Sequence, residues 1–84
     1  MNYNELKAAR IRRGINSKEL AKQLNWSAVK YSVKETGARQ MSLNEAKKIS
    51  AALNLSPAEI LLIFFDIDIN LNGNSFYRSG IGSK

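Results

Sequence analysis

The feature that most constrains the fold of this chain is a repeated signal for the start of a helix. Each copy places a Ser or Asn three residues before a Glu, so that each side chain can accept a hydrogen bond from the other residue's backbone N–H. Pro57 strengthens the third copy, because proline suits the first turn of a helix. The signal predicts a series of short helices. Three such pairs, in chain order, are Asn16 with Glu19, Ser42 with Glu45, and Ser56 with Glu59.

Hydrophobic periodicity and turn residues extend this series to five helices. Leu6, Ala9 and Ile11 favour an amphipathic helix ahead of the first signal. Asn25 and Gly37 suit sharp turns between helices, because both residue types tolerate a left-handed backbone. We therefore expect an all-α, compact five-helix domain over residues 1–65. Its helices are expected at residues 3–13, 17–24, 28–36, 43–53 and 57–64.

Residues 66–84 form a tail with a different pattern. Ile67, Ile69 and Leu71 alternate with polar residues, which is the periodicity of a β-strand. Asn72 and Gly73 form a dipeptide typical of hairpin turns. The end of the tail is rich in Gly and Ser, which predicts disorder. The tail is thus expected to form a short C-terminal strand or hairpin, with a disordered end.

Composition excludes several classes of protein. The chain has 84 residues, with no Cys and no His, so we expect no metal site, no cofactor, no small-molecule substrate and no enzyme activity. Its longest apolar run, residues 60–65, is too short to span a membrane, and its polar N-terminus does not resemble a signal peptide, so a cytoplasmic location is expected. Nine Lys and Arg against three Glu in residues 1–40 account for the whole net charge of +6. Positive charge gathered in one region indicates a polyanionic partner.

The segment of residues 16–37 carries the clearest functional pattern. Two short helices are joined by Asn25, Trp26 and Ser27, and the small Ala21 lets the second helix cross the first closely. This is the helix-turn-helix pattern, in which the second helix enters the DNA major groove. Trp26 has two interpretations, a plug between helices or a stacking platform for bases.

The sequence resembles Cro/repressor-type helix-turn-helix domains, also called the xenobiotic-response-element family, especially those of Gram-positive phages. The resemblance spans roughly residues 4–65. It implies a transcriptional repressor that binds double-stranded DNA, and it implies that Arg10 and Glu35 form a structural ion pair. Segments LKAAR, KELAKQL, YSVKETG and LNEAKKISAALNLSPAEI, at residues 6–10, 18–24, 31–37 and 43–60, carry it.

The resemblance also implies which residues face the DNA. Lys30 can donate to guanine, and Val29 or Val33 can contact thymine methyl groups, unless either valine packs inward. The base-reading set is Ser17, Ala28, Val29, Lys30, Ser32 and Val33. The phosphate-binding set is Asn16, Lys18, Lys34, Arg39 and Gln40, to which Lys22, Arg12 and Arg13 could add positive charge.

Lys34 stands where relatives usually carry an apolar residue. One interpretation is that its aliphatic stem packs on the core while its amine extends outward. The other is a slight rotation of the helix, which would move Val33 inward and bring Lys34 nearer to the phosphates. The sequence leaves both open.

The expected fifth helix and the residues after it contain more apolar side chains than one buried helix face requires. These side chains indicate either a homodimer contact or a tail that folds back on its own domain. A homodimer would bind a palindromic operator with half-sites about 10 bp apart. A phage or mobile-element Cro-like repressor fits such a short chain. The alternative is an antitoxin or protein-interaction module of the same fold. The candidate dimer contacts are Leu62, Phe64, Phe65, Ile67 and Ile69.

Overall fold

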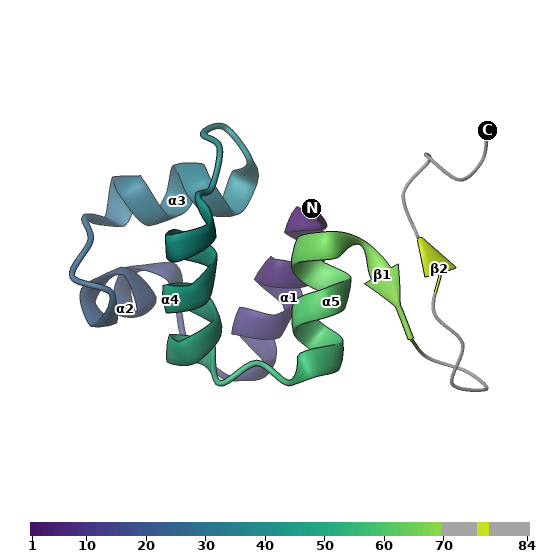
Figure 1. The fold of residues 1–84 in the computed structure, drawn as a ribbon. Coiled ribbons are helices and arrows are strands. Elements are labelled where there is room, and N and C mark those ends of the chain that lie inside the picture. Colours follow the sequence, from purple (N-terminus) through teal and green to yellow (C-terminus); the bar gives the residue numbers. More distant parts are fainter. Residues whose placement is uncertain (70–75, 78–84) are drawn as a thin grey trace.

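A computed structural model of the chain describes residues 1–69 and the backbone of residues 76–77. Five helices make up most of it (Figure 1), which confirms the expected all-α fold. The expected disordered end and the turn at Asn72 and Gly73 lie outside the described residues. The elements are α1 (Tyr3–Arg12), α2 (Ser17–Gln23), α3 (Ala28–Thr36), α4 (Leu43–Leu53), α5 (Pro57–Phe65), β1 (Ile67–Asp68) and β2 (Phe76–Tyr77).

Side-chain caps fix where the helices begin. At α4, the Glu45 N–H donates to Ser42 Oγ at 3.1 Å and the Ser42 N–H donates to Glu45 Oε1 at 2.9 Å. The same reciprocal bonds join the signal pairs at the starts of α2 and α5. Ser27 caps α3 with its side chain alone. All three predicted capping boxes are present, since their geometry depends only on residues three apart.

Left-handed residues end the helices and turn the chain. Asn25 has φ of 61° between α2 and α3, and Gly37 has φ of 85° after α3. At Gly37 a Cβ atom would come within 2.8 Å of the Tyr3 ring, so a larger residue would be both strained and obstructed. The chain therefore needs glycine at this position to pack the end of α3 against the start of α1.

One hydrophobic core joins all five helices. Trp26 packs against its edge and is half-buried, whereas Ile11 lies exposed on α1 rather than in the core. The Asn2 N–H donates to the carbonyl of Ile63 at 2.7 Å, which fixes the start of α1 beside the end of α5 (Figure 1). The buried core consists of Leu6, Ala9, Leu20, Ala21, Tyr31, Ile49, Leu53, Leu55 and Ile63.

The tail leaves α5 as a strand, as its alternation predicted. β1 pairs antiparallel with β2, with Ile67 opposite Tyr77 and Asp68 opposite Phe76. Among the residues the structure describes, no helix is long and apolar enough to cross a membrane.

Candidate nucleic-acid interface

The turn between α2 and α3 is short and tightly hydrogen-bonded. The Trp26 N–H donates to the Ala21 carbonyl at 2.9 Å, and Asn25 supplies the left-handed residue between them. Ala21 is buried where the two helices cross, and a larger side chain there would force them apart. The second helix is therefore held at a fixed angle, with one side exposed.

A buried polar cluster fixes the inner side of α3. Arg10 Nε donates to Glu35 Oε2 at 2.7 Å, and the Tyr31 hydroxyl donates to the same oxygen at 2.9 Å. Arg10 also donates to the Ile15 carbonyl at 2.8 Å, which ties the loop after α1 to this cluster. Burial, and then the neighbouring Glu35 carboxylate, raises the pKa of Tyr31, while the hydrogen bond to Glu35 raises the pKa of Arg10. The cluster therefore holds a neutral tyrosine and a charged pair, and it orients α3 against α1.

The outer side of α3 is open to solvent. Ala28, Val29 and Ser32 are exposed, and 72% of Val29 is accessible. Val33 is half-buried, beside the loop whose Arg39 N–H donates to the Val33 carbonyl at 3.0 Å. Val29 thus does not pack inward, and an exposed valine on a helix fixed from behind is available for contact with another molecule.

Lys30 occupies one flank of α3 and bends toward the scaffold. Its Nζ lies 4.5 Å from the centre of the Trp26 ring and 3.6 Å from Glu45 Oε2. A cation over an indole face is attracted by the ring's electron density. Trp26 packs on the core with its ring centre 6.4 Å from that of Tyr31, as expected for a plug between helices. Since 44% of the Lys30 side chain is exposed, its amine can still reach outward.

Lys34 is held more firmly on the same flank. Its Nζ donates to the Gln40 carbonyl at 2.7 Å and lies 3.0 Å from Glu45 Oε1. Only 15% of its side chain is exposed. The side chain is mostly covered, but the amine does not extend outward as the first sequence interpretation expected, because the α3–α4 loop and α4 bind it. It is therefore less available to phosphates than the sequence suggested.

Glu45 is the functional residue that the sequence identified only as a cap. The Ser42 backbone N–H and then the Lys34 amine lower its pKa to about 2. It is therefore charged at neutral pH and partly neutralises the two lysines beside it. Its capping-box position predicted that it would be fixed in place, but nothing local to it predicted that the start of α4 would lie beside α3.

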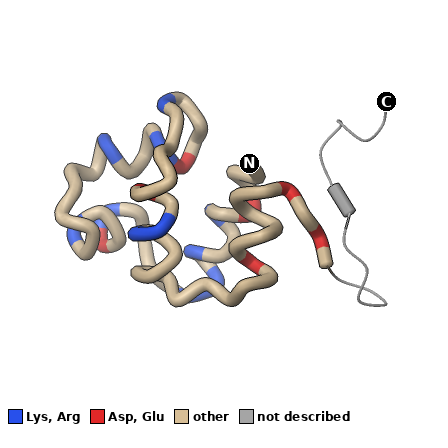
Figure 2. Tube along the Cα trace, in the orientation of Figure 1, with Lys and Arg blue, Asp and Glu red and all other residues tan. Residues whose placement is uncertain are grey.

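The remaining members of the phosphate-binding set lie at the ends of α2 and α3. Lys18, Arg39 and Gln40 are exposed. Asn16 is exposed too, but its side chain caps α2 by accepting from the Glu19 N–H at 2.8 Å. Ser17 is half-buried at the start of α2. In Figure 2, Lys and Arg follow α2, α3 and the next loop, whereas α5 and β1 carry acidic residues without basic ones.

Arg12 and Arg13, at the end of α1, pair with a carboxylate of α5. Arg13 donates to Glu59 Oε1 at 2.8 Å, and Arg12 donates to Glu59 Oε2 at 3.3 Å. Arg13 also donates to the Leu53 and Asn54 carbonyls at the end of α4. These bonds, with Arg13 first, lower the pKa of Glu59 to about 2. The two arginines serve as a clasp between α1, α4 and α5, and Glu59 balances part of the charge that they could add near DNA.

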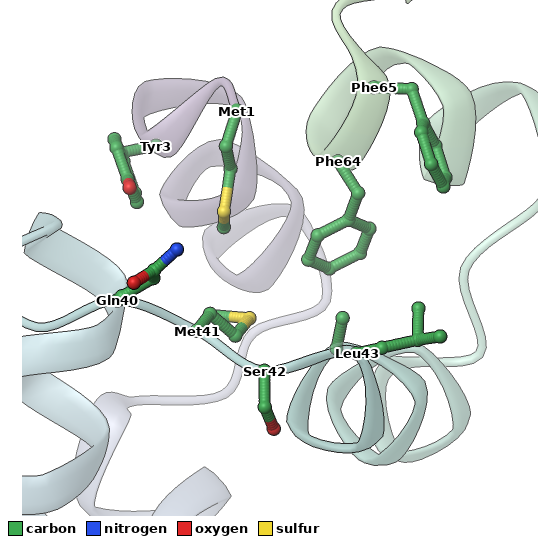
Figure 3. A pocket seen from close by; sticks show the side chains of 9 residues that line it. Met1, Tyr3, Gln40, Met41, Ser42, Leu43, Phe64 and Phe65 are labelled. Atoms are coloured by element: carbon green, nitrogen blue, oxygen red, sulfur yellow. The ribbon is translucent and has the colours of Figure 1, made fainter.

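A second surface lies on the α4–α5 side of the molecule. A groove of about 330 Å³ runs between the start of α1, the α3–α4 loop and α5. Met1, Met41 and Phe64 face one another across it (Figure 3). At its rim Leu43 is 70% exposed and Phe65 is 51% exposed. Of the other candidate dimer contacts, Leu62, Ile67 and Ile69 are half-buried.

Comparison with known protein families gives one match. Residues 4–62 match the family described as a helix-turn-helix domain, which is a DNA-binding domain. No curated protein and no solved structure matches the chain. In residues 1–69 and 76–77, no three His, Cys, Asp or Glu residues lie together as a metal site would require.

Proposed function

The chain belongs to the helix-turn-helix domain family, and we propose that it is a sequence-specific transcriptional regulator whose α3 enters the DNA major groove. One observation carries this proposal. The inner side of α3 is fixed by the cluster of Arg10, Tyr31 and Glu35, while its outer side exposes Val29 with no structural role. A rigid helix with a small, exposed outer face fits the width of the groove.

The outer residues of α3 have chemistry that suits base edges. Val29 and Ala28 can contact thymine methyl groups, and Ser32 can bond to several bases. Lys30 can donate to guanine after leaving Trp26 and Glu45. The full proposed base-reading set is Ser17, Ala28, Val29, Lys30, Ser32 and Val33.

Backbone contacts would come from the residues that flank α3. Lys18 in the first turn of α2 and Arg39 in the loop after α3 are exposed cations and are the strongest candidates. Lys34 and Asn16 already have partners inside the domain, so their contribution is smaller. With Gln40, these residues would position α3 without reading the sequence.

The finer proposal is a homodimeric Cro-like repressor of phage or mobile-element origin, with residues 1–65 as the DNA-binding domain and 66–84 as a tail. Two copies would place two α3 helices on half-sites about 10 bp apart in a palindromic operator. Phe65, Leu43 and the groove beside them offer apolar surface for such a contact. Exposed aromatic surface of this kind is usually covered in an assembly.

The test is selection of a binding site from random duplex DNA, followed by fluorescence-anisotropy titration. We expect a selected palindrome to bind at least about 10³-fold more tightly than a scrambled duplex. Binding should weaken steeply between about 50 and 200 mM salt, because phosphate contacts release counterions. Equal affinity for selected and scrambled duplexes would refute sequence-specific regulation.

The α4–α5 groove favours a second candidate, a protein-interaction module such as an antitoxin. The exposed Leu43 and Phe65 suit a partner protein as well as a second copy of the chain. Co-expression with the product of the adjacent gene distinguishes the two. A stable complex that Phe65→Ser abolishes would support the module, whereas a homodimer without that partner supports the regulator.

A further inference from the structure

Glu45 lies in the first turn of α4, where its carboxylate contacts both lysines of α3, Lys30 and Lys34. Its Oε1 accepts a hydrogen bond from the Ser42 N–H at 2.9 Å and lies 3.0 Å from Lys34 Nζ. Only 17% of the Glu45 side chain is exposed. The carboxylate therefore cannot rotate away from α3 without losing both the cap of α4 and its partner Lys34.

The second carboxylate oxygen faces a weaker partner. Glu45 Oε2 lies 3.6 Å from Lys30 Nζ, and the same amine lies over Trp26. This partly exposed ion pair is weaker than the contact with Lys34, so Lys30 leaves it only where a stronger acceptor is offered. Glu45 and Trp26 thus hold the Lys30 amine against the scaffold, but these contacts are weak enough to break.

We propose that Glu45 is a specificity-determining residue, which suppresses binding to DNA of arbitrary sequence by holding Lys30 away from the phosphates. This rests on the proposed function. A sequence-independent complex depends almost entirely on charge, so a lysine neutralised by Glu45 adds little to it. In the specific complex the acceptors of a guanine draw Lys30 into the groove, and only there does its amine contribute fully.

Removal of the Glu45 charge should therefore strengthen binding to DNA of arbitrary sequence more than binding to the specific site. In Glu45→Gln the freed Lys30 amine can contact a phosphate in any duplex. One additional phosphate contact steepens the dependence of log affinity on log salt by about 0.9. At about 0.1 M salt the same contact raises affinity by roughly tenfold at most. The ratio of specific to nonspecific affinity falls accordingly.

The chain contains a matched control in Glu59. Glu59 is also the third residue of a helix, with the same capping bonds of 2.9 and 3.1 Å to Ser56. It also binds two cations, but they are Arg12 and Arg13, on α1. Glutamine keeps the capping box in both places, so E45Q and E59Q make the same change of charge and differ in position.

The experiment titrates wild type, E45Q and E59Q into a scrambled duplex at several salt concentrations, with anisotropy as the readout. We expect E45Q to bind the duplex about threefold to tenfold more tightly, with a salt slope steeper by nearly one unit. E59Q should change the affinity less than twofold, because charges more than about 8–10 Å away are screened. Equal gains in E45Q and E59Q, or no gain in E45Q, would overturn the proposal.

A second measurement isolates Lys30. Lys30→Ala should lower nonspecific affinity more in the E45Q background than in the wild-type background, because only removal of the Glu45 charge frees the Lys30 amine for a phosphate. In the E45Q background the change should remove most of the gain, which is a coupling between the two sites. Equal losses in both backgrounds would contradict the proposal.

These outcomes separate the proposal from the function on which it rests. If wild type binds selected and scrambled duplexes equally, the regulator function fails and this proposal fails with it. If wild type prefers its selected site and E45Q behaves as wild type does, only the role of Glu45 is refuted.

Discussion

The two ends of this small domain use their exposed surfaces in opposite ways. The α2–α3 end carries exposed cations and a helix whose outer side shows Val29 and Ser32. The α4–α5 end exposes Leu43 and Phe65 beside a groove. Lys47 and Lys48 on α4 are exposed as well, whereas residues 49–69 contain no Lys or Arg. One core stabilises both ends, so the two ends differ in the side chains that they expose to solvent. The first face suits a polyanion and the second suits an apolar partner.

The acidic residues divide along the same line. Glu35 and Glu45 act on α3, where one orients the helix and the other restrains its lysines. Glu59 fastens α1 to α5 at the other end. Each carboxylate therefore balances part of the positive charge beside it, so the charge available to DNA is smaller than the composition suggests.

The largest effect should come from breaking the cluster that orients α3. Glu35→Ala leaves Arg10 buried without its partner, which typically costs about 3–5 kcal/mol. We expect the free energy of unfolding, measured by urea denaturation, to fall by this amount and DNA binding to be lost with the fold. A loss below about 1 kcal/mol would mean that the pair is not needed to hold the two ends together.

A smaller loss should follow from Lys30→Ala at the α3 surface. If Lys30 reads a guanine, discrimination at one base pair of the operator should fall by about 1–3 kcal/mol. The measurement compares wild type and K30A on a set of single-base operator variants. Uniform weakening across all variants would instead identify Lys30 as a phosphate contact.

Acid should weaken the clasp at the opposite end. The pKa of Glu59 is about 2 in the folded chain against an ordinary value of 4.5, so the folded state binds fewer protons than the unfolded state between these values. Its contribution to stability is complete above pH 4.5 and is lost as the pH falls toward 2. Thermal melts between pH 6 and 2 should show a smaller decline for Glu59→Gln than for wild type. Parallel declines would contradict this role.

The smallest change in stability should come from the groove. Phe65→Ser alters an exposed side chain, so the free energy of unfolding should change by no more than about 0.5 kcal/mol. If the groove is a dimer contact, sedimentation should nevertheless shift from dimer to monomer. A large loss of stability in the monomer would show that Phe65 belongs to the core instead.

Local signals in the sequence predicted much of this architecture. The capping pairs placed the starts of α2, α4 and α5 correctly, because a cap depends on residues three apart. Asn25 and Gly37 marked turns for an equally local reason, their tolerance of positive φ. The pair of Arg10 and Glu35 was implied by family resemblance, and the structure contains it.

Contacts between distant segments were harder to predict. Arg12 and Arg13 meet Glu59 across more than forty residues of chain, so only the packing of α1 against α5 brings them together. Likewise, Lys34 looked free because its partner Glu45 stands on the next helix. In both cases the residue types were visible in the sequence, but the pairing depended on tertiary structure.

The central claim is that only the α2–α3 end meets DNA, and amide chemical-shift mapping by NMR tests it most directly. On addition of the selected duplex, we predict large shifts in residues 16–18, in α3 and in the loop of residues 38–42. The amides of α5 (Pro57–Phe65), followed from Ala58 because proline has no N–H, should stay nearly unchanged under conditions in which the oligomeric state does not change. Shifts concentrated along α5 and the groove, with α3 unchanged, would contradict the account.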